Sequence, residues 1–265
     1  SSPLLSSLSL PSSPLPLRSL GTMADEADKA YPDAPLSLRV SLDNIDGRRA
    51  GLLAALCVVI HLTWNSHLLR ALKLLVAFMH EGSHAIAAVL TGGSVDRIEL
   101  YRNEGGACLT TGGNVLIITS AGYLGSMLWG GLILVLACRT RYGQHVSMAL
   151  GIATLLVGLV YVRPMVSFGQ LFVLLSGVAL CAMGRLFGEQ VNDVALKVIG
   201  LTSCMYATLD IKEDVLDRPH LHSDAWAMAQ RTGIPTSFWG ALWILMAVVC
   251  SCYFLLFASQ APAPT

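Results

Sequence analysis

Apolar residues gather in long runs from residue 50 onward, separated by short polar stretches. A run of about 20 apolar residues can cross the hydrocarbon core of a bilayer as a helix. The pattern therefore predicts an all-α membrane protein, a multi-pass helical bundle of about six transmembrane helices. The first run is short for a span, and 191–211 is the most polar. The runs are 51–64, 69–90, 114–138, 146–162, 166–187, 191–211 and 238–258.

Between the second and third runs the pattern changes to one typical of strands. In residues 94–101, Val95, Ile98 and Leu100 are interspersed with charged residues. Residues 103–106 supply turn chemistry, and 107–111 can form a returning strand. We expect a small β-hairpin here, after the second helix. The alternative is a solvent-exposed connector.

The N-terminal segment lacks this organisation. Residues 1–20 are rich in Ser, Pro and Leu, without the apolar core of a secretory signal or the arginines of a transit peptide. Met23 resembles an ordinary start, so residues 1–22 are interpreted as non-native or processed sequence. We expect residues 1–45 to be a disordered tail and residues 46–260 to form the membrane domain.

Composition agrees with a membrane protein. Hydrophobic residues make up 54% of the 265 residues, and charged residues only 13%, about half the share in soluble domains. The 17 basic and 17 acidic residues balance, so nothing favours nucleic acid as a partner. The 7 cysteines include no CxxC pair, and most lie in or beside apolar runs, where cysteine behaves as a small hydrophobe.

The arginines do not give one orientation in the membrane. Arg48 and Arg49 precede the first run and favour a cytoplasmic N-terminal side under the positive-inside rule. If each run is counted as one crossing, Arg139, Arg141 and Arg185 fall on the opposite side.

The second run contains the sequence His80-Glu81-Gly82-Ser83-His84. On a helix, His80 and His84 project from one face about one turn apart, so two neutral imidazoles can reach one Zn²⁺. Zinc acidifies a bound water, and Glu81 can take its proton as general base and later pass it to a leaving amine. Ionisable residues at membrane depth usually mark function. The alternatives are a polar patch satisfied by neighbouring helices and a proton relay in a transporter.

A catalytic zinc site usually has three protein ligands. Asp210 ends the apolar stretch 204–209 and can project from a helix end into the membrane domain. Asp214 lies one turn later and can share its face. Either aspartate can instead be a helix-terminal charge that faces water. For the remaining candidates, packing or solvent exposure is the simpler interpretation: His61, His67, His145, His220 and His222.

Several short stretches occur in an order and spacing that together are specific. They are Trp64-Asn65 with Leu69-Arg70, Phe78-Met-His-Glu-Gly-Ser-His84, Ala88-Val-Leu-Thr-Gly-Gly93, Glu104-Gly-Gly106, Ser120-Ala-Gly-Tyr-Leu-Gly-Ser126, Tyr206-Ala-Thr-Leu-Asp-Ile-Lys-Glu-Asp214, Ser223-Asp-Ala225, Gly233, Trp239-Gly240 and Trp243. On these residues the chain resembles the peptidase M50B-like branch of the site-2 protease (M50) intramembrane metalloproteases.

The resemblance implies a metalloendopeptidase that uses zinc and hydrolyses peptide bonds of membrane-spanning substrates. It implies His80 and His84 as zinc ligands, Glu81 as the catalytic base and Asp210 as the third ligand, with Asp214 as the alternative. The implied partners are a membrane-protein substrate and the lipid bilayer. The hairpin could hold the substrate as an added strand.

The chain departs from the usual family pattern at two places. Gly82-Ser83 stands where a bulky residue and Gly usually precede the second His, and Leu209-Asp210-Ile211 replaces a Leu-Asp-Gly form. Two other functions therefore stay open. One is a non-catalytic zinc-binding relative that acts as a membrane binding or chaperone protein. The other is a transporter that uses the same buried ionisable residues.

Overall fold

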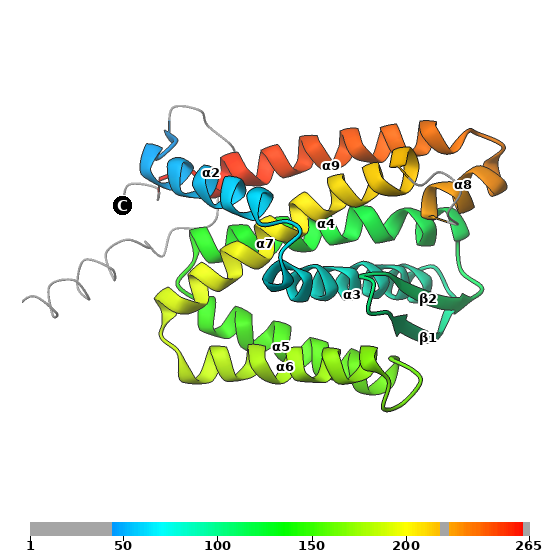
Figure 1. The fold of residues 1–265 in the computed structure, drawn as a ribbon, viewed down its shortest axis with the longest axis horizontal. Helices are drawn as coiled ribbons and strands as arrows, with labels where there is room; N and C mark the ends of the chain where they lie inside the picture. Colours follow the sequence, from blue (N-terminus) through cyan, green and yellow to red (C-terminus); the bar gives the residue numbers. More distant parts are fainter. Residues whose placement is uncertain (1–43, 218–222, 262–265) are drawn as a thin grey trace, which may run out of the picture. The chain divides into compact units, whose positions relative to one another are not determined.

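The computed structural model describes residues 44–217 and 223–261 of the protein, most of them helical (Figure 1). The expected disordered tail lies outside the described residues except for its last two positions. In chain order the elements are α2 (Gly47–Leu62), α3 (His67–Leu90), β1 (Ser94–Leu100), β2 (Gly106–Thr111), α4 (Val115–Arg139), α5 (Gly143–Val160), α6 (Phe168–Leu186), α7 (Glu189–Lys212), the π-helical turn η2 (Glu213–Asp217), α8 (Asp224–Thr232) and α9 (Thr236–Ala258).

Five of the described helices are long and apolar enough to cross a membrane: α4, α5, α6, α7 extended to Val215, and α9. With the hairpin, they confirm the predicted helical membrane protein. α2 has 16 residues and is about 24 Å long, short of a hydrocarbon core of roughly 30 Å. α3 has 24 residues but carries polar side chains along its length.

Arg49 in the first turn of α2 and Arg139 at the end of α4 lie at the same end of the bundle. The Arg49 guanidinium donates a hydrogen bond to the carbonyl of Gln260 over 3.4 Å, and Arg139 donates to the same carbonyl over 2.8 Å. The expectation that Arg139 lies on the opposite side from Arg49 is therefore wrong. Because α2 is too short to cross alone, α2 and α3 together make one pass along the bundle, and α4 makes the return.

α3 is the buried centre of the described fold. Its residues from Leu74 to Met79 are all buried, and it packs against α4, α7 and both strands. The largest core cluster joins it to residues of the hairpin and of α4 to α7. Polar groups in such a position cost free energy unless they are paired. The polar side chains of α3 therefore need partners from other elements.

α4 and α7 approach each other closely through glycines. A Cβ on Gly130 would lie 2.7 Å from the carbonyl oxygen of Gly200, and a Cβ on Gly200 would lie 2.8 Å from that of Gly130. Beside them, the Ser203 hydroxyl donates to the carbonyl of Ser126 over 2.7 Å. Small residues of this kind let two helix backbones pack closely in a membrane. The contact fixes the position of α4 beside α7.

We expect Gly130→Ala to lower the free energy of unfolding by about 1–3 kcal/mol, because the added methyl group must displace the α7 backbone. Thermal unfolding in detergent, followed by circular dichroism, measures the change. The matched control is Gly51→Ala in α2, where a Cβ would meet nothing within 4 Å. Alanine is the better helix former there, so its Tm should stay or rise. An unchanged Tm for Gly130→Ala would contradict the close approach.

The predicted hairpin is present, with β1 and β2 antiparallel and Ile98 opposite Cys108. The other edge of β1 pairs with the connection between α5 and α6. There the Ile98 N–H donates to the carbonyl of Tyr161 over 2.8 Å, and the Arg163 N–H donates to that of Ile98 over 2.9 Å. In an antiparallel ladder, the backbone groups of the opposite residue, Cys108, then point away from β1. The outer edge of β2 is thus turned toward α3.

Candidate metal centre

α3 places both motif histidines on one buried face. Their ring centroids lie 4.8 Å apart at an interplanar angle of 77°, as the one-turn spacing of residues 80 and 84 requires. His80, Glu81 and His84 are only 9%, 6% and 7% exposed. The predicted arrangement of the motif on a buried helix is therefore found.

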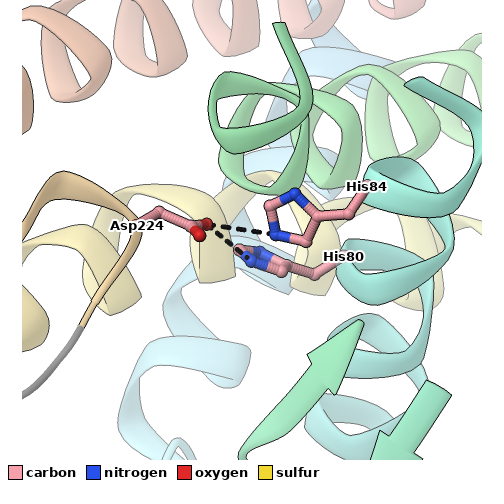
Figure 2. A group of neighbouring side chains, drawn as sticks. All are labelled: His80, His84 and Asp224. Atoms are coloured by element: carbon pink, nitrogen blue, oxygen red, sulfur yellow. Dashed lines mark hydrogen bonds and ion pairs between the residues drawn. The ribbon is translucent and has the colours of Figure 1, made fainter. Parts of the chain in front are cut away.

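The third group comes from α8. The Asp224 Oδ2 atom lies 3.1 Å from Nε2 of His80 and 3.2 Å from Nε2 of His84. Figure 2 shows the carboxylate pointing from the start of α8 toward both rings. Within the described ranges, His80, His84 and Asp224 form a group whose potential ligand atoms all lie within 4.8 Å of one another.

The two aspartates expected from the sequence lie elsewhere on the same cavity. Asp214 accepts a hydrogen bond from the Tyr123 hydroxyl over 2.6 Å. Neither Asp210 nor Asp214 belongs to the group around the imidazoles. The physical reason is the chain path, because the turn after α7 leads into α8, which returns toward α3 and brings Asp224 to the rings. Asp224 therefore takes the place that we expected for Asp210.

A local sequence pattern accompanies Asp224. The Ser223 hydroxyl caps α8 and accepts from the N–H of Trp226 over 3.3 Å, which is a common start of a helix. Asp224 then occupies the first turn, where the helix dipole stabilises a carboxylate. Ser223-Asp-Ala225 was one of the stretches behind the family resemblance. Asp224 was not predicted as a metal ligand from the sequence, and the loop with His220 and His222 lies outside the described residues.

Hydrogen bonds orient His84 for ligation. Its Nδ1 atom lies 2.6 Å from the carbonyl oxygen of Ile118, so this nitrogen carries the proton and Nε2 is left to bind a metal. A second-layer carbonyl of this kind is typical of metal-ligating histidines. The Nε2 atoms of both rings point at the same carboxylate oxygen.

The residues fit a zinc ion. Two imidazoles and a carboxylate are ligands that zinc accepts in catalytic sites. Ligand atoms about 2.0–2.1 Å from a tetrahedral zinc are about 3.3 Å from one another, close to the separations of Asp224 from both rings. The opposite side of the group is formed by Gly122 of α4, where a Cβ would lie 2.3 Å from Nε2 of His80 and 2.5 Å from Nε2 of His84. Glycine there leaves the space that an ion needs.

The two histidines lower the pKa of the Asp224 carboxyl group. Burial, the largest influence, would raise the pKa of its carboxyl group, but the interactions with His84 and His80 outweigh it and hold this pKa well below its ordinary value. A carboxylate that is ionised at neutral pH is the form that binds a cation.

Glu81 lies against the outer edge of β2. Its carboxylate lies near the backbone of Cys108. A Cβ on Gly106 would lie 2.7 Å from both Cγ and Oε1 of Glu81, so the strand backbone touches the side chain. The hairpin therefore fixes where the Glu81 carboxylate lies.

A cavity of about 810 Å³ opens over these groups. Its walls come from α3, β2, α4, α7 and α8, and they include both motif histidines, Glu81 and Asp224. It is large enough to admit water and a segment of extended chain beside the candidate ligands.

Comparisons with known proteins give a match at the level of a family. No curated protein and no solved structure matches the chain. The family model described as Peptidase M50B-like matches residues 53–254. The match covers most of the chain, including α3 with its motif, the hairpin and α8 with Asp224. The chain belongs to the Peptidase M50B-like family.

Proposed function

We propose that the protein is a zinc-dependent intramembrane endopeptidase that hydrolyses peptide bonds of membrane-spanning substrates. The observation that carries the proposal is the convergence of His80, His84 and Asp224, with Glu81 beside them. The family supports the same class of reaction. The transporter alternative does not require three ligand atoms around a space left by a glycine.

Each residue has a role in the proposed reaction. A zinc ion held by His80, His84 and Asp224 supplies Lewis acidity, which polarises the scissile carbonyl and acidifies a water molecule. Glu81 takes a proton from the attacking water and delivers it to the leaving amine nitrogen. The backbone of Gly106 lies against the Glu81 side chain and keeps its carboxylate in position for both transfers.

We place this site in a multi-pass integral membrane protein. α2 and α3 make one pass, and the five long apolar helices make five more. The site then opens at the end of the bundle that carries the hairpin, away from Arg49 and Arg139. Polar side chains line the cavity, and they allow water to reach the Glu81 carboxylate within the membrane domain.

The edge of β2 that faces away from β1 supports a substrate that binds as an added strand. Because Ile98 uses its backbone groups on the side away from β2, those of Cys108 face the cavity. Cleavage requires an extended peptide, and an open strand edge binds extended chain through main-chain hydrogen bonds. We propose that the substrate lies along β2, with its scissile carbonyl next to Glu81.

Metal analysis and a cleavage assay test the proposed function. The full chain is purified in mild detergent, its zinc is measured by mass spectrometry, and it is reconstituted with a protein that has one transmembrane helix. We expect about one zinc per chain, cleavage within the membrane segment, loss of cleavage on chelation and recovery with added zinc. Zinc without cleavage of any membrane substrate would favour a non-catalytic binding protein. Solute or proton flux without stoichiometric zinc would favour the transporter.

A further inference from the structure

Glu104 lies at the tip of the hairpin in a conformation that its side chain does not favour. Its φ is +70°, in the left-handed region where glycine is the usual residue and a non-glycine side chain is strained. The next two residues are glycines and could adopt such a conformation more easily. A strained glutamate at this point indicates that contacts of its side chain hold the tip.

The Glu104 carboxylate is paired with two cations of α3. Its Oε1 lies 3.1 Å from Nε of Arg70, and its Oε2 lies 2.5 Å from Nζ of Lys73. The Lys73 side chain is only 9% exposed, and its ammonium lies over the Trp64 ring, 5.2 Å from the centroid. A buried ammonium needs a carboxylate partner far more than an exposed one does. We call Glu104, Lys73 and Arg70 the hairpin latch.

The backbone of the tip is tied as well. The Tyr206 hydroxyl of α7 donates to the Glu104 carbonyl over 3.4 Å, and the Tyr101 N–H donates to the carbonyl of Gly105 over 2.9 Å. The latch thus fastens one end of β2, while the pairing of β1 with the α5–α6 connection fastens the other strand. Two residues after Glu104, the backbone of Gly106 touches the side chain of Glu81.

We propose that Glu104 is a positioning residue, which holds the hairpin tip so that the backbone of Gly106 keeps the Glu81 carboxylate at the metal centre. The inference rests on the proposed function and names a residue outside the ligand set and the general base. The latch acts on the orientation of Glu81. It therefore affects turnover and leaves the zinc ligands in place.

Three variants separate the effect of the Glu104 charge from the effect of its side-chain length. Glu104→Gln keeps the length of the side chain and removes its charge. Glu104→Asp keeps the charge on a shorter side chain, and aspartate tolerates the left-handed region better. Glu99→Gln is the matched control, since Glu99 lies on the same hairpin, has the same 22% side-chain exposure and pairs with Arg97 at 2.6 Å. Glu99 does not line the cavity.

The test compares these variants of the full chain, loaded with zinc, in detergent or nanodiscs. We expect Glu104→Gln to lower kcat at least about tenfold with KM and zinc content within about twofold of wild type. Glu104→Asp should keep most of the activity, and Glu99→Gln nearly all of it. If Glu104→Gln behaves like Glu99→Gln, or if only KM or zinc content changes, the proposal is overturned.

Hydrogen exchange of the peptide covering residues 100–111 measures how firmly the hairpin latch holds the tip. This measurement does not depend on substrate cleavage. We expect faster exchange in Glu104→Gln, wild-type exchange in Glu104→Asp, and an α9 peptide that exchanges equally in all variants. Unchanged exchange of the hairpin in Glu104→Gln would overturn the latch. If the zinc-loaded wild type cleaves nothing, the proposed function fails, and the exchange comparison still decides whether Glu104 holds the hairpin.

Discussion

Glu81→Gln is expected to lower the rate of peptide cleavage by about 10²–10⁴-fold, the range that general acid–base catalysis contributes. Glutamine has nearly the same shape as glutamate, but it cannot take a proton from water. His80, His84 and Asp224 are untouched, so bound zinc should stay at the wild-type level. The measurement is single-turnover cleavage of a transmembrane substrate, with zinc quantified in the same samples.

The control for this variant is Glu99→Gln on the same hairpin, which should cleave like wild type. Cleavage by Glu81→Gln at the wild-type rate would show that the reaction does not use this carboxylate as its base. Loss of zinc together with activity would show instead that Glu81 is needed to assemble the metal centre. In both cases the proposed division of roles within the motif would be wrong.

Asp224→Asn is expected to weaken zinc binding at least about 100-fold. Mutation of a residue that only hydrogen-bonds to a metal ligand lowers metal affinity by about 10–100-fold, and loss of a ligand should lower it further. Asparagine fills the same volume, but its neutral amide is a poor ligand for zinc beside two neutral imidazoles. The measurement is the zinc retained after dialysis against a series of chelators of known affinity.

Asp210→Asn is the matched variant for this prediction. Asp210 lines the same cavity but lies outside the group around the imidazoles, so its loss should leave zinc affinity within a few-fold of wild type. If Asp210→Asn loses zinc and Asp224→Asn keeps it, the ligand set is the one expected from the sequence. The Tm of both variants, measured with zinc removed, shows whether either change unfolds the protein.

Local patterns predicted most of the fold and three of the four residues of the candidate site. The expected run 114–138 is α4 (Val115–Arg139), and 166–187 is α6 (Phe168–Leu186), because apolar length alone sets such helices. His80 and His84 were predicted together from their spacing alone. Their spacing brings them together within one turn, whatever the rest of the chain does.

Asp224 could not be placed in this way because it lies 144 residues from His80 along the chain. Its position depends on the packing of a nine-residue helix, whereas Asp210 was favoured for its place at the end of an apolar stretch. The single pass that we propose for α2 and α3 was not predicted, for a related reason. Whether a 16-residue helix crosses a membrane depends on the helix that comes after it.

α8 is attached to the rest of the protein mainly by two kinds of contact. Ala225 and Met228 pack with Tyr123 and Trp243 in a small apolar cluster, and Asp224 faces the two imidazoles. If the ion binds as proposed, metal occupancy and the docking of α8 are linked equilibria, since a ligand that binds only the docked form stabilises it by mass action. Chelation would then loosen α8, and undocking of α8 would release the metal, so the bound ion would link α3 to α8 across more than half of the sequence.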